Sequence, residues 1–323
     1  MKELECGVLV IGGGAAGTRA AYEAKRAHPE LDVYLAVTGR YETGGSTNMV
    51  ASEALGINAP FNYEGDGDNP DIYLEDTLQT GGGLGDPALC RTLAYESADR
   101  VQELEDLGVP FVRHNGHIQQ QKLSGCTKAR SLTCGGSTGR QITSRLKDAA
   151  LKAGVTLLEN TTFYGLCKDK KGRVCGAWGQ DENGALTISA RAVILATGGP
   201  GSIFSVNVTP PTQTGDGWAM AYDAGCRFVN MEFFQIGPAV VHPGLTFIIH
   251  SHMWRFLPKL TNREGREFLA DYCKNGTTPE EALELKAMSY PFSVRTDAKY
   301  VDIAIFQEIA HGRGTDEGGI YFD

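Results

Sequence analysis

The ten residues VLVIGGGAAG, at positions 8–17, carry the strongest structural signal in this chain. Residues 8–11 form a short apolar run that ends in glycines, which predicts a buried parallel strand. Residues 15–26 are rich in alanine and predict a helix, while residues 32–37 predict a second strand. Together these segments predict a βαβ unit with the glycines between its first strand and its helix.

Three of these glycines, Gly12, Gly14 and Gly17, match the pattern G-x-G-x-x-G. In that pattern the first glycine permits a tight turn, the second lets the backbone approach a pyrophosphate, and the third lets the helix pack closely on the strand. Phosphate oxygens then meet free N–H groups at the helix N-terminus. The strand-turn-helix context favours a dinucleotide site over a glycine turn without a ligand.

The second strand lacks the acidic residue that usually ends it and binds the adenosine ribose. It ends instead at Thr38, and the nearest carboxylate is Glu42, four residues later. Three alternatives stay open: Thr38 binds the ribose, Glu42 binds it, or backbone groups and water do.

The rest of the chain predicts further α/β structure and then a change of composition. Residues 39–85 are rich in Gly, Asn and Asp and predict a long loop region with short helices. The other expected elements are helices at 87–107, 139–153 and 218–225, and strands within 155–195 with turns at Gly172 and Gly184. From about residue 232 the chain is richer in His, Arg and aromatic residues, which predicts a second, smaller domain.

Composition excludes several classes of function. The net charge is −9 and no block of basic residues stands out, so we do not expect nucleic acid as a partner. No apolar run approaches the ~20 residues of a membrane helix, and the start lacks the pattern of a signal peptide. The eight cysteines include no C-x-x-C pair, and we expect reduced thiols in a cytoplasmic protein.

Four segments, in order, resemble the FAD-dependent flavoprotein subunits of fumarate reductase and succinate dehydrogenase, with L-aspartate oxidase and adenylylsulfate reductase as relatives. They are the glycine loop, GGSTNMVA at 44–51 followed by LGIN at 55–58, ARAVILATGG at 190–199, and TGDGWAMA at 214–221. The resemblance implies an α/β fold: a Rossmann-like FAD-binding domain with a parallel sheet and a β-meander at residues 1–231. It also implies a partial α+β capping domain, which binds substrate, at residues 232–323.

The resemblance also implies which residues contact the cofactor. They are Gly12, Gly14, Ala15, Ala16, Gly17, Gly45, Ser46, Thr47, Asn48, Ala51, Thr197, Gly198 and Asp216. Backbone N–H groups and hydroxyls in these segments suit a flavin, because it gains negative charge on reduction. Asp216 has a second interpretation, as the N-terminal cap of the helix that follows it.

At two positions the sequence departs from the family. Relatives that hold FAD covalently carry it on a histidine in a Ser-His-Thr segment, and here Thr47 follows Ser46, so we expect non-covalent FAD. Gly237 stands where the family has its substrate-binding histidine.

Other residues are candidates for the substrate carboxylates and the proton. They are Arg295, His250, His252 and Arg255. Each could equally be a surface residue. His250 and His252 would share one face of a strand, but no Cys or acidic cluster accompanies them, so we do not expect a metal.

The expected activity is hydride transfer between flavin N5 and a small carboxylate or enoate substrate. The alternative is an FAD-carrying electron-transfer subunit or one half of a split enzyme, and a paralogue without cofactor is a third. The chain stops at residues 319–323, where a strand begins and the relatives continue, so we expect a fragment, a short form or a half. An iron–sulfur partner or a complementary chain, and an oligomer, are the expected assemblies.

Overall fold

The computed structural model describes residues 2–49, 55–63, 65–123, 126–242, 244, 246–289 and 296–323. It divides into two compact units, the first formed by Met1–Gln121 and Lys128–Asn230, the second by Lys122–Thr127 and Met231–Asp323. The assignment of residues 1–231 to cofactor binding and of 232–323 to a substrate cap stays a prediction.

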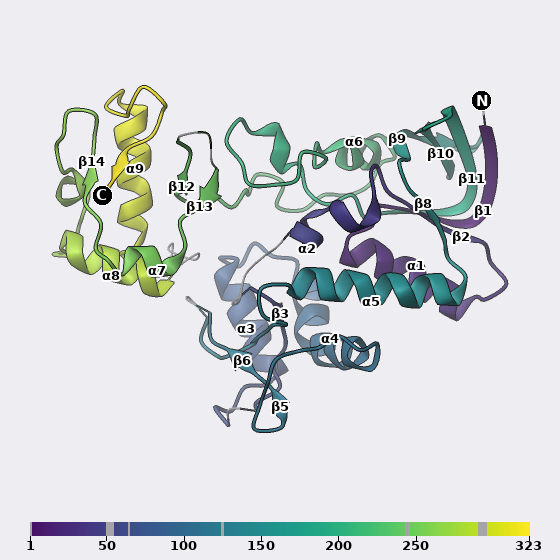
Figure 1. The fold of residues 1–323 in the computed structure, drawn as a ribbon, viewed down its shortest axis with the longest axis horizontal. Coiled ribbons are helices and arrows are strands. Elements are labelled where there is room, and N and C mark those ends of the chain that lie inside the picture. The colour runs from purple at the N-terminus through teal and green to yellow at the C-terminus, as the bar shows by residue number, and fades with distance from the viewer. Residues whose placement is uncertain are drawn as a thin grey trace. The chain divides into compact units, whose positions relative to one another are not determined.

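A six-stranded sheet forms the centre of the first unit, with the strand order β8-β2-β1-β11-β10-β9 (Figure 1). Its strands are β1 (Lys2–Ile11), β2 (Val33–Ala36), β8 (Thr156–Leu158), β9 (Thr162–Lys168), β10 (Val174–Asp181) and β11 (Gly184–Leu195). Strands β8, β2, β1 and β11 run parallel, and β9 to β11 form an antiparallel meander. The predicted α/β class, with its parallel sheet, is confirmed.

The register of the parallel strands aligns their ends. Ile11 pairs with Ala36 of β2 on one side and with Leu195 of β11 on the other. The carboxyl ends of three strands therefore lie at one edge of the sheet, which is where open α/β sheets bind ligands. β1 is longer than the predicted 8–11 because its polar start, from Lys2, pairs with β11.

Helices cover both faces of this sheet. α1 (Ala15–Ala27) lies alongside α5 (Thr138–Ala153) (Figure 1), and Ala21 and Ala150 pack with Val10 of β1 on one face. Leu9 of β1 points to the opposite face and packs with Met220 of α6 (Asp216–Asp223). This alternation along β1 is what a strand buried on both faces requires, and each such side chain contributes about 1.5–3 kcal/mol.

A helical insertion follows β2 in the chain. It holds α3 (Pro70–Thr80) and α4 (Pro87–Asp106), whose N-termini are capped by the side chains of Asn69 and Asp86 with proline at the first helical position. The remaining elements of the first unit are short: η1 (Tyr41–Thr43), α2 (Ser46–Met49), β3 (Ile57–Asn58), β4 (Arg113–His114), β5 (His117–Ile118), β6 (Gln120–Gln121), β7 (Ser131–Leu132) and η2 (Gly201–Ile203).

The second unit has its own apolar core, built around Trp254, Phe268 and Val301. Its elements are β12 (Ala239–Val240), β13 (Phe247–Ile248), α7 (Ser251–Trp254), β14 (Leu260–Thr261), η3 (Leu269–Asp271), α8 (Pro279–Ser289), α9 (Lys299–Ala310) and β15 (Tyr321–Phe322). β15 forms the expected final strand by pairing antiparallel with β14.

A buried carboxylate, Glu308 on α9, organises the polar interior of the second unit. It accepts hydrogen bonds from Arg313 Nη2 at 2.7 Å, from Tyr272 Oη at 2.6 Å and from Asn262 Nδ2 at 3.0 Å. The Arg313 guanidinium, which makes the strongest contribution, lowers the pKa of Glu308 from 4.5 to about 2. The charges of this unit therefore satisfy one another.

All eight cysteines are free thiols. Among the described helices, none combines the length and the apolar character that crossing a bilayer would require.

Candidate functional site

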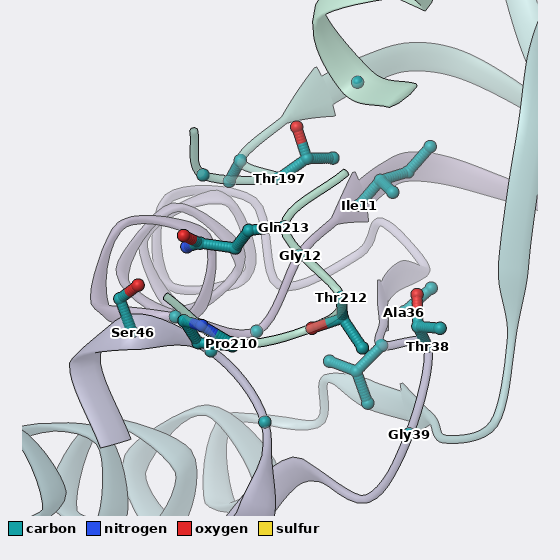
Figure 2. A pocket seen from close by; sticks show the side chains of 18 of the residues that line it. Ile11, Gly12, Ala36, Thr38, Gly39, Ser46, Thr197, Pro210, Thr212 and Gln213 are labelled. Atoms are coloured by element: carbon teal, nitrogen blue, oxygen red, sulfur yellow. The ribbon is translucent and has the colours of Figure 1, made fainter. Parts of the chain in front are cut away.

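A cavity of about 460 Å³ opens at the carboxyl edge of the parallel strands in the first unit. Figure 2 shows Ile11 at the end of β1 and Gly12 after it, Thr38 and Gly39 after β2, and Thr197 after β11 around one space. The segment from Pro210 to Gln213 and the loop that contains Ser46 complete the wall (Figure 2). The cavity therefore gathers segments that are far apart in the sequence.

The glycine loop forms the part of the wall at the N-terminus of α1. A Cβ on Gly12, whose φ is +114°, would lie 2.2 Å from the carbonyl oxygen of Ala196, and a Cβ on Gly17 would lie 1.8 Å from that of Gly12. Only glycine permits these approaches. Gly14 is the N-cap and has no side chain to cap the helix, so first-turn N–H groups other than that of Ala15, which donates to Thr47, stay available to an anion.

The loop before α2 forms a second part of the wall through Gly45, Ser46 and Thr47. The Thr47 hydroxyl accepts a hydrogen bond from the backbone N–H of Ala15 at 3.3 Å, which ties this loop to the start of α1. A Cβ on Gly139 would lie 1.8 Å from the Thr47 carbonyl oxygen, so α5 approaches the loop closely from behind.

Asn48 is buried behind the cavity instead of lining it. Its Nδ2 donates to the carbonyl oxygens of Tyr41 and Gly44, each at 2.9 Å, and its Oδ1 accepts from the Thr143 hydroxyl. The side chain therefore fixes the backbone of the loop that carries Gly45 to Thr47. Its predicted contact with the cofactor stays a prediction.

The third part of the wall is the turn after β11 and the start of α6. A Cβ on Gly217 would lie 1.8 Å from the Thr197 hydroxyl, so these two segments are in direct contact. Asp216 is the first residue of α6, and its carboxylate accepts from the Thr214 hydroxyl. The capping interpretation of Asp216 is wrong, because Gly215 is the N-cap and no side chain caps this helix.

The cavity carries little charge. Among the described residues that line it, Arg40 is the only basic residue, Asp216 is the only acid, and there is no His or Cys. Thr38 lies in the wall, whereas Glu42 is paired with Lys147, which lowers the pKa of Glu42, and does not line this cavity. Of the two side chains considered for the ribose, the structure places Thr38 at the cavity.

Most of the predicted cofactor residues meet at this cavity: Gly12, Gly14, Ala15, Ala16, Gly45, Ser46, Thr47, Thr197, Gly198 and Asp216. Gly17 and Asn48 stand behind the wall, and Ala51 lies outside the described residues.

Sequence reasoning missed other lining residues, among them Gly39, Arg40, Tyr41, Phe163 and the segment 210–213. Their signals differ. Gly39 and Arg40 directly follow a predicted parallel strand and could have been found from that position. The proline pair in 210–213 gives no comparable signal in the sequence.

The predicted substrate residues belong to the second unit. His250 is the N-cap of α7 and Arg255 its C-cap, and both are exposed. The strand expected at His250 to His252 is wrong, because α7 begins at Ser251 and helical backbone does not place alternate residues on one face. Arg295 lies outside the described residues. No group of three potential metal ligands occurs among the residues that the structure describes.

Comparisons with known proteins agree with this geometry. The model of the family described as FAD binding domain matches residues 7–306. The chain is 31% identical to one of the subunits of the fumarate reductase (CoM/CoB) of Methanothermobacter marburgensis, over 99% of this chain and 55% of that protein. It is 32% identical to the L-aspartate oxidase of a Nostoc species, over 82% of this chain and 45% of that protein.

A solved structure, Mycobacterium smegmatis Sdh1 in complex with UQ1, matches with a TM-score of 0.84 at 28% identity and covers 100% of this chain and 53% of that one. The chain spans about half the length of the relatives it matches. The sequence prediction of family and cofactor is confirmed: the chain belongs to the FAD binding domain family, in the group of fumarate reductase and succinate dehydrogenase flavoproteins, and its cofactor is FAD.

Proposed function

We propose that the first unit holds FAD non-covalently in its cavity and that the protein works as a flavoprotein oxidoreductase on a small carboxylate or enoate. The observation that carries this proposal is the cavity itself, where the glycine loop, the Gly45–Thr47 loop and the Thr197 turn meet at the carboxyl edge of the sheet. When bound, FAD supplies hydride transfer at flavin N5.

The chain's own groups have distinct roles in this proposal. The N–H groups at the start of α1, apart from that of Ala15, which donates to Thr47, bind the pyrophosphate, because they lie at the positive end of the helix dipole. The Thr38 hydroxyl binds the adenosine ribose. Backbone N–H groups at Gly45 and Ser46 face the polar edge of the flavin and stabilise the negative charge of its reduced form.

Non-covalent attachment is supported by the residue types in the wall. A flavin tethered to protein needs a nucleophilic side chain beside it, and the described wall offers neither His nor Cys. Thr47 occupies the position of the family's histidine, and its hydroxyl is already engaged by the N–H of Ala15.

For the substrate we propose His250, His252, Arg255 and Arg295 as the groups that bind carboxylate or move the proton. Cationic side chains can neutralise carboxylates and imidazoles can exchange protons near neutral pH. His250 and Arg255 are both exposed.

A second candidate function is supported by a specific observation. Gly237 offers no side chain where the family has its substrate histidine. An electron-transfer subunit or half of a split enzyme, which relies on an iron–sulfur partner or a complementary chain for catalysis, accounts for that loss. We propose a cytoplasmic oligomer in either case.

Turnover separates the two functions. The FAD-loaded protein is mixed anaerobically with a reduced dye and with fumarate or another enoate, and dye oxidation is followed. The enzyme hypothesis predicts oxidation that depends on the enoate and saturates with it. Oxidation of the dye without any dependence on an enoate, with transfer instead to an added iron–sulfur protein, would favour the electron-transfer role.

A further inference from the structure

Tyr41, directly beneath the glycine loop, is buried, and its hydroxyl lies within hydrogen-bonding distance of two partners. Its hydroxyl lies 2.7 Å from the hydroxyl of Thr18 on α1 and 3.1 Å from the carbonyl oxygen of Thr143 on α5. Thr18 in turn lies 3.2 Å from the carbonyl oxygen of Gly13, to which it can donate. The Tyr41 ring also packs under Gly13, because a Cβ there would lie 3.1 Å from ring carbons of Tyr41.

The bond to Gly13 fixes the direction of one peptide plane in the loop. In a trans peptide the C=O of one residue and the N–H of the next point in opposite directions. Because the Gly13 carbonyl points inward to Thr18, the N–H of Gly14 points away from the protein interior, and Gly14 lines the cavity. Thr18 therefore acts on the donor that faces a pyrophosphate.

The two hydroxyls have two protons for three contacts. At 2.7 Å one proton must lie between Thr18 and Tyr41, since two facing lone pairs would repel. Thr18 can donate to Gly13 only when Tyr41 supplies that shared proton. The reverse chain would end at Thr143, whose carbonyl is already a helix acceptor inside α5. In the chain that runs from Tyr41 through Thr18 to the Gly13 carbonyl, the single Tyr41 proton goes to Thr18 instead of Thr143, and such chains strengthen each bond.

The same tyrosine holds the other side of the cavity through its backbone. Its N–H donates to Glu159 Oε1 at 2.7 Å, and its carbonyl accepts from Asn48 Nδ2 at 2.9 Å. Burial raises the pKa of the Tyr41 hydroxyl to about 12, so it stays protonated and able to donate.

We propose that Thr18 and Tyr41 are positioning residues for the cofactor pyrophosphate: a hydroxyl chain that holds the Gly13–Gly14 peptide with its N–H toward the phosphates. This inference rests on the proposed binding of FAD in the cavity. Thr18 does not line the cavity and Tyr41 does, and the hydroxyls of both are proposed to act through the peptide.

The experiment measures the Kd of FAD for the wild type and for T18V, T18S, Y41F and the double variant T18V/Y41F. We expect T18V to weaken binding about tenfold, T18S to restore it to within about twofold, and Y41F to weaken it about threefold. Because Tyr41 acts through Thr18, the double variant should bind no more weakly than T18V alone.

A second readout distinguishes positioning from a general loss of structure. The ³¹P resonances of bound FAD should shift in T18V while the visible flavin spectrum and the unfolding midpoint stay those of the wild type. T156V and Y164F change an exposed threonine and an exposed tyrosine of the same unit and serve as matched controls that should leave both unchanged.

Two results would overturn the inference alone: T18V that binds FAD as tightly as the wild type, or effects of T18V and Y41F that add. Binding of ADP, which carries the pyrophosphate without the flavin, is measured in parallel. If the wild type binds ADP but not FAD, the proposed function is refuted. The ADP affinities of the variants then test whether Thr18 positions the pyrophosphate-binding peptide. Wild type that binds neither refutes both.

Discussion

The cavity of the first unit and the interior of the second unit use their polar groups in opposite ways. In the first, the groups at the cavity are backbone N–H groups and hydroxyls, with Arg40 and Asp216 the only charges among the described lining residues. In the second, charged side chains bind one another: Glu308 with Arg313, and Lys286 with Asp302 at 2.7 Å. The cavity thus keeps donors for a ligand, whereas the interior of the second unit uses them for stability.

This difference explains why the cofactor site can be recognised and the substrate site cannot. A site built from backbone depends on glycines, whose positions are visible in a sequence. A site built from side chains can exchange its residues without leaving such a trace, as Gly237 in place of a histidine illustrates. Substitutions in the two units should therefore separate cofactor affinity from stability.

The largest effect is expected for G17A. The added Cβ would lie 1.8 Å from the Gly12 carbonyl oxygen, a backbone atom that cannot move aside without displacing α1 from the strand. We expect a cost of about 3 kcal/mol, equivalent to a loss of about a hundredfold in FAD affinity by titration. G136A adds a Cβ where nothing lies within 4 Å and is the control. Equal affinities for the two variants would contradict the close-packed cradle.

E308Q should act on stability alone. It removes the charge of the buried carboxylate that pairs with Arg313, which should lower the free energy of unfolding. Chemical denaturation measures this loss, while the Kd of FAD should stay within about twofold of wild type. E284Q, at an exposed glutamate, should change neither quantity. A large fall in FAD affinity for E308Q would contradict the proposal that substitutions in the second unit change stability without changing cofactor affinity.

The dependence of stability on acidic pH should also report on the Glu308 carboxylate. The folded-state pKa of Glu308, about 2, is below its ordinary 4.5, so its contribution is complete above about pH 4.5 and is lost as the pH falls toward 2. The free energy of unfolding should therefore fall in this range for wild type and fall less steeply for E308Q. Parallel pH profiles would show that Glu308 does not supply this acid sensitivity.

The smallest effect separates the two candidates for the ribose. T38V removes a hydroxyl from the cavity wall and should weaken FAD binding about fivefold. E42Q should have almost no effect, since Glu42 is paired with Lys147 away from the wall. FAD titrations of both variants check this ranking, and the reverse order would assign the ribose to Glu42.

The sequence predicted the helices and strands whose signals lie within their own residues. The βαβ unit, helices α4 and α5 and the meander follow from apolar periodicity and from turn residues such as Gly172 and Gly184. α3 lies in a segment that we expected to be mostly loop. The glycine-rich composition around it outweighed the helix-start signal of Asn69 and the proline after it. The polar start of β1 needed its partner β11 to be recognised.

The site was predictable to a similar degree. The glycines after β1 and the Thr197 turn after β11 were predicted, since backbone geometry demands them, whereas Gly39 and Arg40 after β2 were missed. The Asn48 side chain supports the loop from behind, which a sequence does not show, and its predicted contact with the cofactor stays a prediction. His250 and His252 were placed on a strand although the helix α7 begins between them, because a short segment carries both signals.

The central claim is that the first unit holds FAD without a covalent bond, and release by acid tests it most directly. The purified protein is loaded with FAD, freed of excess cofactor and precipitated with acid, and the flavin absorption of supernatant and pellet is compared. We predict a yellow protein whose flavin passes entirely into the supernatant as FAD. Flavin that stays in the pellet, or a protein that takes up none, would contradict the claim.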